Sequence, residues 1–412
     1  MRTTIVMAVL AAALACGTSA RAEDAAEEAP PDPTRGQWDA FLDPVRDAED
    51  EYVVGTQKWI EDQTKIHVGA GITWPTWFHN FNEPDSDLNT LHSLDPDHAS
   101  PEFNFGQLFA TRANEGWIPG FGLKLDVGRA AKRIKADWDG DGGLNVGDTF
   151  EKNSFEVQDA YLTWTVPEDM PAKGLTVKAG KFVTLLGAEV IEPWANYNFS
   201  RSFLFGLAIP FTHTGGLVTY PVTDKLSVTG GVVVGWDNVA DNNDSPSFMG
   251  NVTYIVNDMV TLAGNGIFGP EQIDKIGPKR GVADFVATIK PTSALTFLLN
   301  YDWGHEDDAA VAEAGTALWQ GFAAVANYQF TDRFSTAVRG EWFEDHTGTR
   351  TGIRQTLVEG TLTAKYQLTQ HLAMRAEYRR DYSTRSRVFE KEGASAREYQ
   401  DIAGFEFTYL FN

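Results

Sequence analysis

From residue 65 to the end of the chain, apolar and polar side chains alternate with a period of two. The alternation is clearest at 66–74, 121–128 and 226–236, where large apolar residues take every second position. In a β-strand this period places successive side chains on opposite faces. One apolar face and one small or polar face are typical of barrel strands between lipid and a wet lumen. A two-sheet sandwich would alternate in the same way.

The connections between the alternating segments favour the barrel. Some are tight hairpin turns, at 222–226, 256–260, 330–334 and 368–372. Between them lie longer polar stretches rich in Gly and Asp, at 237–247, 268–279, 304–316, 344–354 and 383–396. Short turns at one rim and long loops at the other are typical of outer-membrane barrels, whereas a sandwich has no reason to keep this order.

The alternation predicts an all-β fold, a transmembrane antiparallel β-barrel of about sixteen strands. The expected strands are 65–74, 103–112, 121–130, 155–166, 175–183, 213–221, 226–236, 247–256, 260–267, 281–290, 295–303, 317–330, 334–343, 355–366, 372–382 and 398–411. Sixteen strands leave an aqueous channel. The last strand alternates Phe405, Phe407, Tyr409 and Phe411 with other residues, as in the C-terminal assembly signal of such barrels, although that signal usually ends in the aromatic and not in Asn412.

The first 64 residues follow other patterns. Residues 1–22 combine an early arginine, an apolar stretch and an Ala-Arg-Ala cleavage pattern, which is typical of an export signal. The only cysteine, Cys16, lies in this segment, and a lipoprotein signal ending there is the alternative. Residues 23–35 are acidic and Pro-rich, which predicts a disordered lead-in.

Apolar residues then recur at helical spacing over residues 36–64. They predict a short amphipathic periplasmic helix ahead of the barrel, which would occupy residues 65–412. The helix could rest at the rim, plug the pore or assemble a coiled coil, and we favour the rim because few heptads are present.

Charge narrows the class of protein. With 57 acidic residues and a net charge of −23, the chain is a poor partner for nucleic acid, which binds clustered Lys and Arg. Lipopolysaccharide bridged by divalent cations suits such a surface better. No uninterrupted apolar run reaches about 18 residues after the signal, which excludes a helical membrane protein. We therefore expect a protein of the outer membrane of a Gram-negative bacterium, in contact with its lipids.

Residues 178–246 resemble the OmpL-like beta-barrel porins. The resemblance rests on Gly180-Lys181-Phe182, Thr184, Gly187, Glu189, Asn198, Ser200-Arg201-Ser202, Pro210, His213-Thr214-Gly215, Gly235-Trp236-Asp237 and Asp241-Asn242-Asn243. Strand spacing extends it more loosely over about residues 65–412. It implies pore formation without a defined substrate. Phosphate-selective porins are a more distant resemblance, and the chain has no lysine-rich loop to support it.

Between the fifth and sixth predicted strands, residues 184–212 are too long and too aromatic for a solvated rim loop. By resemblance to sixteen-stranded porins, this segment is expected to fold inward and narrow the channel. Glu189, Glu192 and Arg201 are then candidate constriction charges, which set ion preference across a water-filled gap. The alternative is that Arg201 and Glu189 pair and pin the loop.

Further charged residues take the inward-facing positions of the predicted strands 334–343 and 372–382. They are Arg339, Glu341, Arg375, Glu377, Arg379 and Asp381. A mixed ladder of this kind would create a transverse field in the lumen. We favour the simpler interpretation that these residues pair across strands.

Residues 137–148 reproduce the calcium-loop spacing of EF-hands and dockerins, with a glycine at position six and an acid at position twelve. The expected ligands are Asp137, Asp139, Asp141, Gly143 through its carbonyl, Asn145 directly or through water, and Asp148. Asp148 is shorter than the usual glutamate, and no helices flank the loop. An acidic, solvated loop is the alternative. The first outer loop also carries His79, His92 and His98, whose irregular spacing favours a hydrated loop over a soft-metal site.

The sequence thus predicts a porin that lets small hydrophilic solutes or ions diffuse passively through a water-filled barrel, and not an enzyme. A homotrimer is expected only by resemblance to sixteen-stranded porins. The main alternative is a non-conducting structural or adhesive barrel. An outer-membrane hydrolase is the weaker one, because His213 near Ser200 and Ser202 has no Gly-x-Ser-x-Gly element beside it.

Overall fold

The computed structural model of the chain describes residues 54–94, 97–98, 101–137, 154–167, 169–311, 315–385, 388–393 and 396–411. The strands are β1 His67–Asn80, β2 Phe105–Arg112, β3 Gly120–Val127, β4 Phe155–Thr165, β5 Thr176–Val183, β6 Thr212–Thr223, β7 Leu226–Val233, β8 Ser247–Asn257, β9 Val260–Gly269, β10 Arg280–Ile289, β11 Leu295–Glu306, β12 Ala317–Gln329, β13 Phe334–Asp345, β14 Gln355–Gln367, β15 Leu372–Ser383 and β16 Tyr399–Phe411. The helical elements are α3 Gly55–Thr64, α4 Arg129–Arg133, η2 Pro193–Ala195 and η3 Leu204–Ala208.

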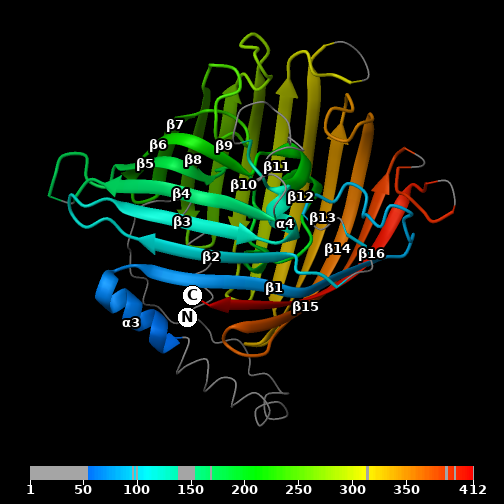
Figure 1. Ribbon diagram of the computed structural model, residues 1–412, viewed down its shortest axis with the longest axis horizontal. Coiled ribbons are helices and arrows are strands. Elements are labelled where there is room, and N and C mark those ends of the chain that lie inside the picture. The colour runs from blue at the N-terminus through cyan, green and yellow to red at the C-terminus, as the bar shows by residue number, and fades with distance from the viewer. Residues whose placement is uncertain are drawn as a thin grey trace.

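The sixteen strands form one closed antiparallel barrel, in which each strand pairs with its neighbours in sequence. β1 pairs with β16, with Ala70 opposite Phe411 and Asn80 opposite Ile402. Closure leaves no strand edge unpaired, as hydrocarbon requires, because lipid cannot solvate a free N–H or C=O. In Figure 1, β1 to β5 run across the view in front of the steeper strands β8 to β13, as the opposite walls of one barrel.

The two ends of the barrel differ in their connections. One end, hereafter the loop end, carries long connections such as 184–211 and 346–354. The other, hereafter the turn end, carries tight turns such as 224–225 and 258–259. The predicted order of turns and loops is therefore confirmed, as is the number of strands.

The largest difference from the predicted strand boundaries is at the end of the first strand. The alternation predicts an end at residue 74, and a proline follows at position 75. β1 instead continues to Asn80, because Pro75 lies at a register shift between Thr73 and Thr76, where the missing N–H is not needed for pairing.

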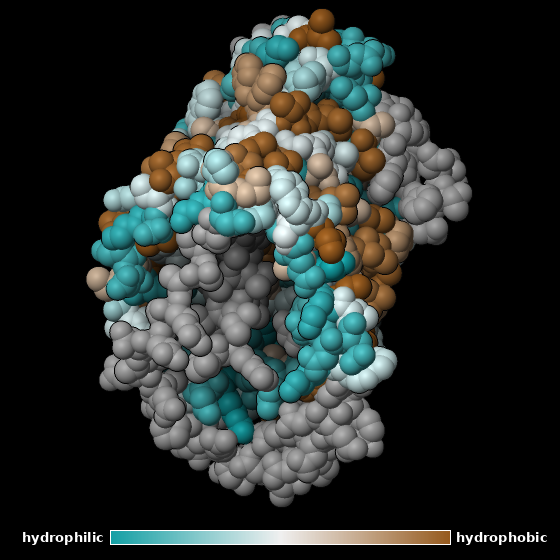
Figure 2. All heavy atoms as spheres, turned by 90° about the vertical axis from the view of Figure 1, so that its left-hand side faces the viewer, coloured by the Kyte–Doolittle hydropathy of each residue, from teal (hydrophilic) through white to brown (hydrophobic). Residues whose placement is uncertain are grey.

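The two faces of the wall differ in polarity as the alternation predicts. In the middle of β13 and β14, Val338 and Leu362 are 53% and 52% exposed, whereas their neighbours Arg339 and Thr361 are buried inside the barrel. Figure 2 shows hydrophobic residues on the outer flank and hydrophilic residues around the hollow at this end of the molecule. The outer face is thus suited to lipid and the inner face to water and polar groups.

The described part of the predicted N-terminal helix is α3, which lies against the start of β1. Gln57 donates a hydrogen bond to the Val68 carbonyl at 3.0 Å, and Glu61 lies 3.6 Å from His67. This segment rests at the rim of the turn end, as favoured. The side chain of Trp59 in this helix is 65% exposed.

The expected export signal at 1–22, the lead-in at 23–35 and the helical residues before 54 lie outside the described residues. Among the helices that the structure describes, none is both long and apolar enough to cross a bilayer.

Replacing Leu362 by arginine tests which face meets lipid. Leu362 lies mid-strand on the outer face, so Leu362→Arg should lower the free energy of unfolding by about 2–4 kcal/mol. Guanidinium unfolding in lipid vesicles, followed by tryptophan fluorescence, measures this change. Leu318→Arg is the matched control, since Leu318 also points outward but lies at the loop end of β12 and should cost about 0–1 kcal/mol. Equal losses in the two variants would contradict the placement.

Candidate functional site

The connection from β5 to β6, residues 184–211 and hereafter the inner loop, lies inside the barrel. Its buried apolar side chains are Leu185, Leu186, Ile191, Phe199, Phe203, Leu204, Phe205, Ala208 and Ile209. Most of them form one cluster with inward side chains of the wall, among them Phe105 of β2, Trp319 of β12 and Phe343 of β13. The apolar area removed from water in this way favours the inward fold of the loop.

Two polar side chains fix the shape of the inner loop. The Asn196 side chain accepts a hydrogen bond from the Val190 N–H at 2.9 Å and donates one to the Val190 carbonyl at 2.8 Å. The Arg201 guanidinium donates to the carbonyls of Val190, Ile191 and Phe199 at 3.0, 2.6 and 2.6 Å. These bonds satisfy carbonyl groups that no helix or sheet pairs.

Two carboxylates of the wall accept hydrogen bonds from consecutive N–H groups of the inner loop. The pairs are Glu341 of β13 with Phe203 and Leu204, and Glu377 of β15 with Phe199 and Ser200, at 2.6 to 3.1 Å. Both carboxylates are buried. Each carboxyl group satisfies two buried N–H groups that have no other partner in a helix or sheet, so each holds one turn of the loop in place.

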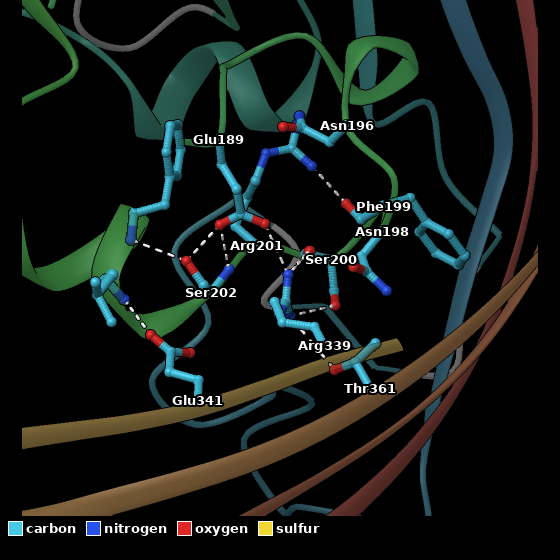
Figure 3. A network of polar contacts seen from close by, with 12 residues as sticks. Glu189, Asn196, Asn198, Phe199, Ser200, Arg201, Ser202, Arg339, Glu341 and Thr361 are labelled. Atoms are coloured by element: carbon cyan, nitrogen blue, oxygen red, sulfur yellow. Dashed lines mark hydrogen bonds and ion pairs between the residues drawn. The ribbon is translucent and has the colours of Figure 1, made fainter. Parts of the chain in front are cut away.

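Arg339 of β13 lies at the centre of the contacts between the loop and the wall (Figure 3). Its guanidinium donates to the Ser200 carbonyl at 2.8 Å and forms ion pairs with Glu189 of the loop at 2.7 Å and Glu359 of β14 at 2.6 Å. The arginine is 1% exposed. A buried guanidinium of this kind is stable only because carboxylates and carbonyls surround it.

Two arginines of β15 bind the loop through its carbonyls. Arg375 donates to Pro193 at 3.0 Å and pairs with Glu406 of β16. Arg379 donates to the carbonyl of Arg201 at 2.5 Å. The wall therefore supplies both acceptors and donors to the backbone of the loop.

The opposite wall holds the loop through Glu192. Its carboxylate accepts from the ammonium of Lys124 on β3 at 2.5 Å, from Gln158 on β4 at 2.8 Å and from Gln107 on β2 at 3.3 Å. Burial alone raises the pKa of Glu192, but the charge of Lys124 and the hydrogen bonds from Lys124 and Gln158 outweigh it and lower the pKa to about 2. Glu192 is therefore ionised, and it anchors the loop across the lumen from Arg339.

Two glycines of the wall make room for aromatic side chains of the loop. A Cβ at Gly71 of β1 would overlap the ring of Trp194, and one at Gly404 of β16 would lie 2.9 Å from the ring of Phe199. Phe199 also packs against Phe78, with ring centroids 5.4 Å apart. The inner loop thus contacts the wall on both sides of the β1–β16 closure.

The structure brings together two groups of residues that the sequence analysis treated separately. Glu189 is joined to the ladder by its ion pair with Arg339, and Arg201 by the bond from Arg379 to its carbonyl. Glu192 lies apart from the ladder, against β2 to β4.

The ladder residues themselves are all buried: Arg339, Glu341, Arg375, Glu377, Arg379 and Asp381. Arg339 and Arg375 pair across strands, and Arg379 pairs with Asp381 on its own strand at 2.6 Å.

Sequence reasoning missed the wall residues that hold Glu192. Lys124, Gln107 and Gln158 are not among the candidate residues of the sequence analysis. It also missed Asn300 of β11, whose side-chain oxygen accepts from the Ala188 N–H at 3.1 Å. The available signal was their parity, since each lies on the face opposite to the outward apolar residues of its strand.

Of the expected calcium ligands, only Asp137 belongs to the described residues, and Asp139, Asp141, Gly143, Asn145 and Asp148 lie outside them. In the first outer loop, residues 83 and 85–88 are exposed as expected of a hydrated loop, whereas His92 and His98 are buried. His92 forms a fully buried ion pair with Asp381 at 2.9 Å, and His98 accepts from the Asn80 N–H at 2.9 Å. Among the described residues, no cluster of His, Asp or Glu is arranged to hold a metal ion.

A family model described as "Putative beta-barrel porin-2, OmpL-like" matches residues 75–411. No curated protein matches the chain.

Several solved structures are similar in fold. The outer membrane channel DcaP of Acinetobacter baumannii is 10% identical with a TM-score of 0.56, over 84% of this chain and 97% of its own. The anion-selective porin from Comamonas acidovorans is 12% identical with a TM-score of 0.52, over 84% and 100%. The trimer form of OmpT of Vibrio cholerae is 12% identical with a TM-score of 0.53, over 84% and 98%. At these identities the likeness concerns the fold alone.

Removing the Glu341 carboxylate should release one turn of the inner loop. Glu341→Ala leaves the N–H groups of Phe203 and Leu204 buried without an acceptor, which costs roughly 2 kcal/mol and should speed their amide exchange roughly thirtyfold. Hydrogen–deuterium exchange on the folded barrel measures this. Glu344→Ala is the control, since Glu344 lies on the same strand with the opposite parity. Unchanged exchange at residues 203 and 204 would show that the carboxylate does not hold the loop.

Proposed function

The chain belongs to the family of OmpL-like beta-barrel porins and is an outer-membrane porin, and on that premise we propose that the inner loop is the constriction of its channel. Small hydrophilic solutes and ions diffuse passively through a barrel of this kind. The part of the barrel that narrows the channel determines which sizes and charges of solute pass through it.

The observation that carries the proposal is that the inner loop is attached to opposite walls. Glu192 binds it to β2, β3 and β4, and Arg339, Glu341 and Glu377 bind it to β13 and β15. A segment held at both sides of a barrel must cross the lumen between them. Any solute that passes from the loop end to the turn end therefore passes the loop.

The charges on the loop favour a preference for cations. Glu189 and Glu192 are the acidic candidates of the loop, and the guanidinium of Arg201 is directed to carbonyl groups of the loop itself. Fixed charges at the narrowest part of a channel act on ions over a short water-filled gap, where the interaction is screened least.

The double variant Glu189→Gln and Glu192→Gln tests this role. Arg339 keeps its pair with Glu359, and Lys124 keeps Asp159 at 3.5 Å, so the barrel should still fold. Each lost charge is worth about 0.5 kcal/mol to an ion ~8 Å away in a water-like medium, roughly a twofold change in the permeability of a cation and the opposite change for an anion. Reversal potentials in a salt gradient across planar bilayers should therefore shift towards anions.

The matched control is Asp224→Asn with Asp258→Asn, which removes the same charge from two exposed turns at the turn end. It should leave the reversal potential where it is. An unchanged reversal potential in the Glu189 and Glu192 variant would reject the constriction role of these acids. A purified barrel that carries no current at all would favour the structural or adhesive alternative.

We further propose that residues 137–148 bind calcium at the loop end. Support comes from the spacing of oxygen-bearing residues and from the start of the segment. The Asp137 N–H donates to the carbonyl of Asp237 at 2.7 Å, and its own carbonyl accepts from the Val239 N–H at 2.6 Å. These two bonds fix the first expected ligand against the connection between β7 and β8.

Calorimetric titration of the purified porin with calcium tests the site. Binding should release or absorb heat and should stabilise the barrel by about 2.7 kcal/mol at a free calcium concentration 100 times the dissociation constant. Asp139→Asn with Asp141→Asn should abolish both effects, and Asp224→Asn should preserve them. No heat and no calcium-dependent stabilisation would end the idea.

Two further proposals concern the location and the assembly of the porin. We place the loop end outside the cell, facing lipopolysaccharide, and take residues 1–22 as a cleaved export signal. Assembly as a homotrimer is supported by the likeness to OmpT of Vibrio cholerae, which was solved in a trimer form.

A further inference from the structure

Two tryptophans and two arginines form a stack at the loop end, apart from the contacts of Figure 3. The guanidinium carbon of Arg350 lies 5.2 Å from the ring centroid of Trp236 and 5.2 Å from that of Trp319. That of Arg280 lies 4.9 Å from Trp236. Trp319 and Arg280 point inward from β12 and β10, so the stack faces the interior of the barrel.

The connection that carries Arg350, residues 346–354, is held rigidly by one carboxylate. Asp345 accepts hydrogen bonds from consecutive N–H groups of this connection, including Gly348 at 2.8 Å, Arg350 at 2.9 Å and Thr351 at 2.8 Å. Asp345 is fully buried. The backbone of Arg350 is therefore fixed before any solute arrives, which lowers the entropy that binding costs.

The Arg350 side chain uses only one of its donors. Its Nε donates to the Leu207 carbonyl of the inner loop, and within the described part of the chain its two terminal nitrogens form no hydrogen bond and no ion pair. The side chain is partly exposed. A guanidinium normally presents these nitrogens as a fork to a carboxylate or phosphate.

The carboxylates around Arg350 are engaged elsewhere. Asp237 accepts from the N–H groups of Phe211 and Thr212 at 2.7 and 2.8 Å. Glu306 pairs with Arg280 at 2.9 Å. Asp345 is taken up by the backbone of its own connection. Among the residues that the structure describes, the positive charge of Arg350 therefore has no direct counter-charge.

The pKa of Arg350 also reflects this lack of a paired carboxylate. Burial and the neighbouring Arg280 lower the pKa of Arg350 to about 10, against the opposite effect of Glu306, Asp345 and Asp237. The group is still charged at neutral pH, but its charge is undercompensated. An anion that reached the terminal nitrogens would relieve that cost.

We propose that Arg350 is the anion-recognising residue of a solute-binding site at the loop end of the channel, and that its ligand class is small solutes bearing a carboxylate. The open guanidinium fork matches the two oxygens of a carboxylate, and the Trp236 and Trp319 rings hold the fork in place. The site lies next to the inner loop, because Arg350 and Trp319 donate to the neighbouring carbonyls of Leu207 and Ala208. A solute bound there would wait at the entrance to the constriction.

Uptake of succinate into proteoliposomes of the full-length purified porin at pH 7.5 tests the site, with succinamide as the uncharged analogue. Initial uptake of succinate should saturate with concentration, and uptake of succinamide should rise linearly. Arg350→Gln should raise the half-saturating concentration of succinate roughly tenfold or more, because a charged hydrogen-bonded pair is lost. The half-saturating concentration of Arg350→Lys should lie between those of the parent and of Arg350→Gln, because lysine keeps the charge but not the two parallel N–H donors of the guanidinium.

Arg354→Gln is the matched control, because Arg354 is exposed on the same connection and its loss changes the net charge equally. It should leave saturation unchanged, and near-ultraviolet circular dichroism should show that the Arg350 variants keep their tryptophan packing. The proposal is overturned if succinate uptake is linear in the parent, if succinamide saturates as well, or if Arg350→Gln saturates at the parental concentration. The result is independent of the constriction, since saturation does not require the loop charges that set the reversal potential.

Discussion

Polar and charged side chains that are buried inside a barrel must meet opposite charges or peptide groups, and here the peptide groups come from the inner loop. Glu341 and Glu377 are buried carboxylates, and each accepts two consecutive N–H groups of the loop. Without the loop these carboxylates would need water, and without the carboxylates the loop would bury unpaired N–H groups. The wall and the inner loop therefore stabilise each other, and a substitution in one of them alters the stability of the other.

This dependence makes the inner loop a part of the wall and not a flexible flap. The apolar cluster around Trp319 and Phe343 fixes it towards β12 and β13, and Glu192 fixes it towards β2 to β4. Contacts from several directions leave few ways to open the loop locally. The loop end carries a second, smaller arrangement, in which a buried Asp345 orders the connection that presents Arg350. In both arrangements a buried carboxylate accepts hydrogen bonds from consecutive N–H groups and so fixes the conformation of the backbone.

The barrel was predictable from the sequence because its signal is local. Alternation such as Phe121 to Val127 fixes each strand, and tight turns such as 224–225 fix the order. The partners of the inner loop were less accessible. Nothing in the sequence near Glu192 points to Lys124, and the pairing of Glu189 with Arg339 spans residues far apart in the chain. Their positions in the alternation place such side chains inside the barrel. Which of them contact each other depends on the register in which the strands of the closed barrel pair.

The bonds that hold the inner loop also impose an order on assembly. Ser200 precedes Arg339 by 139 residues, and Arg201 precedes Arg379 by 178. The loop emerges from synthesis early, yet its partners on β13 and β15 come last, so its final shape has to wait for the late strands. The loop therefore reaches its final position only when the wall around it is complete.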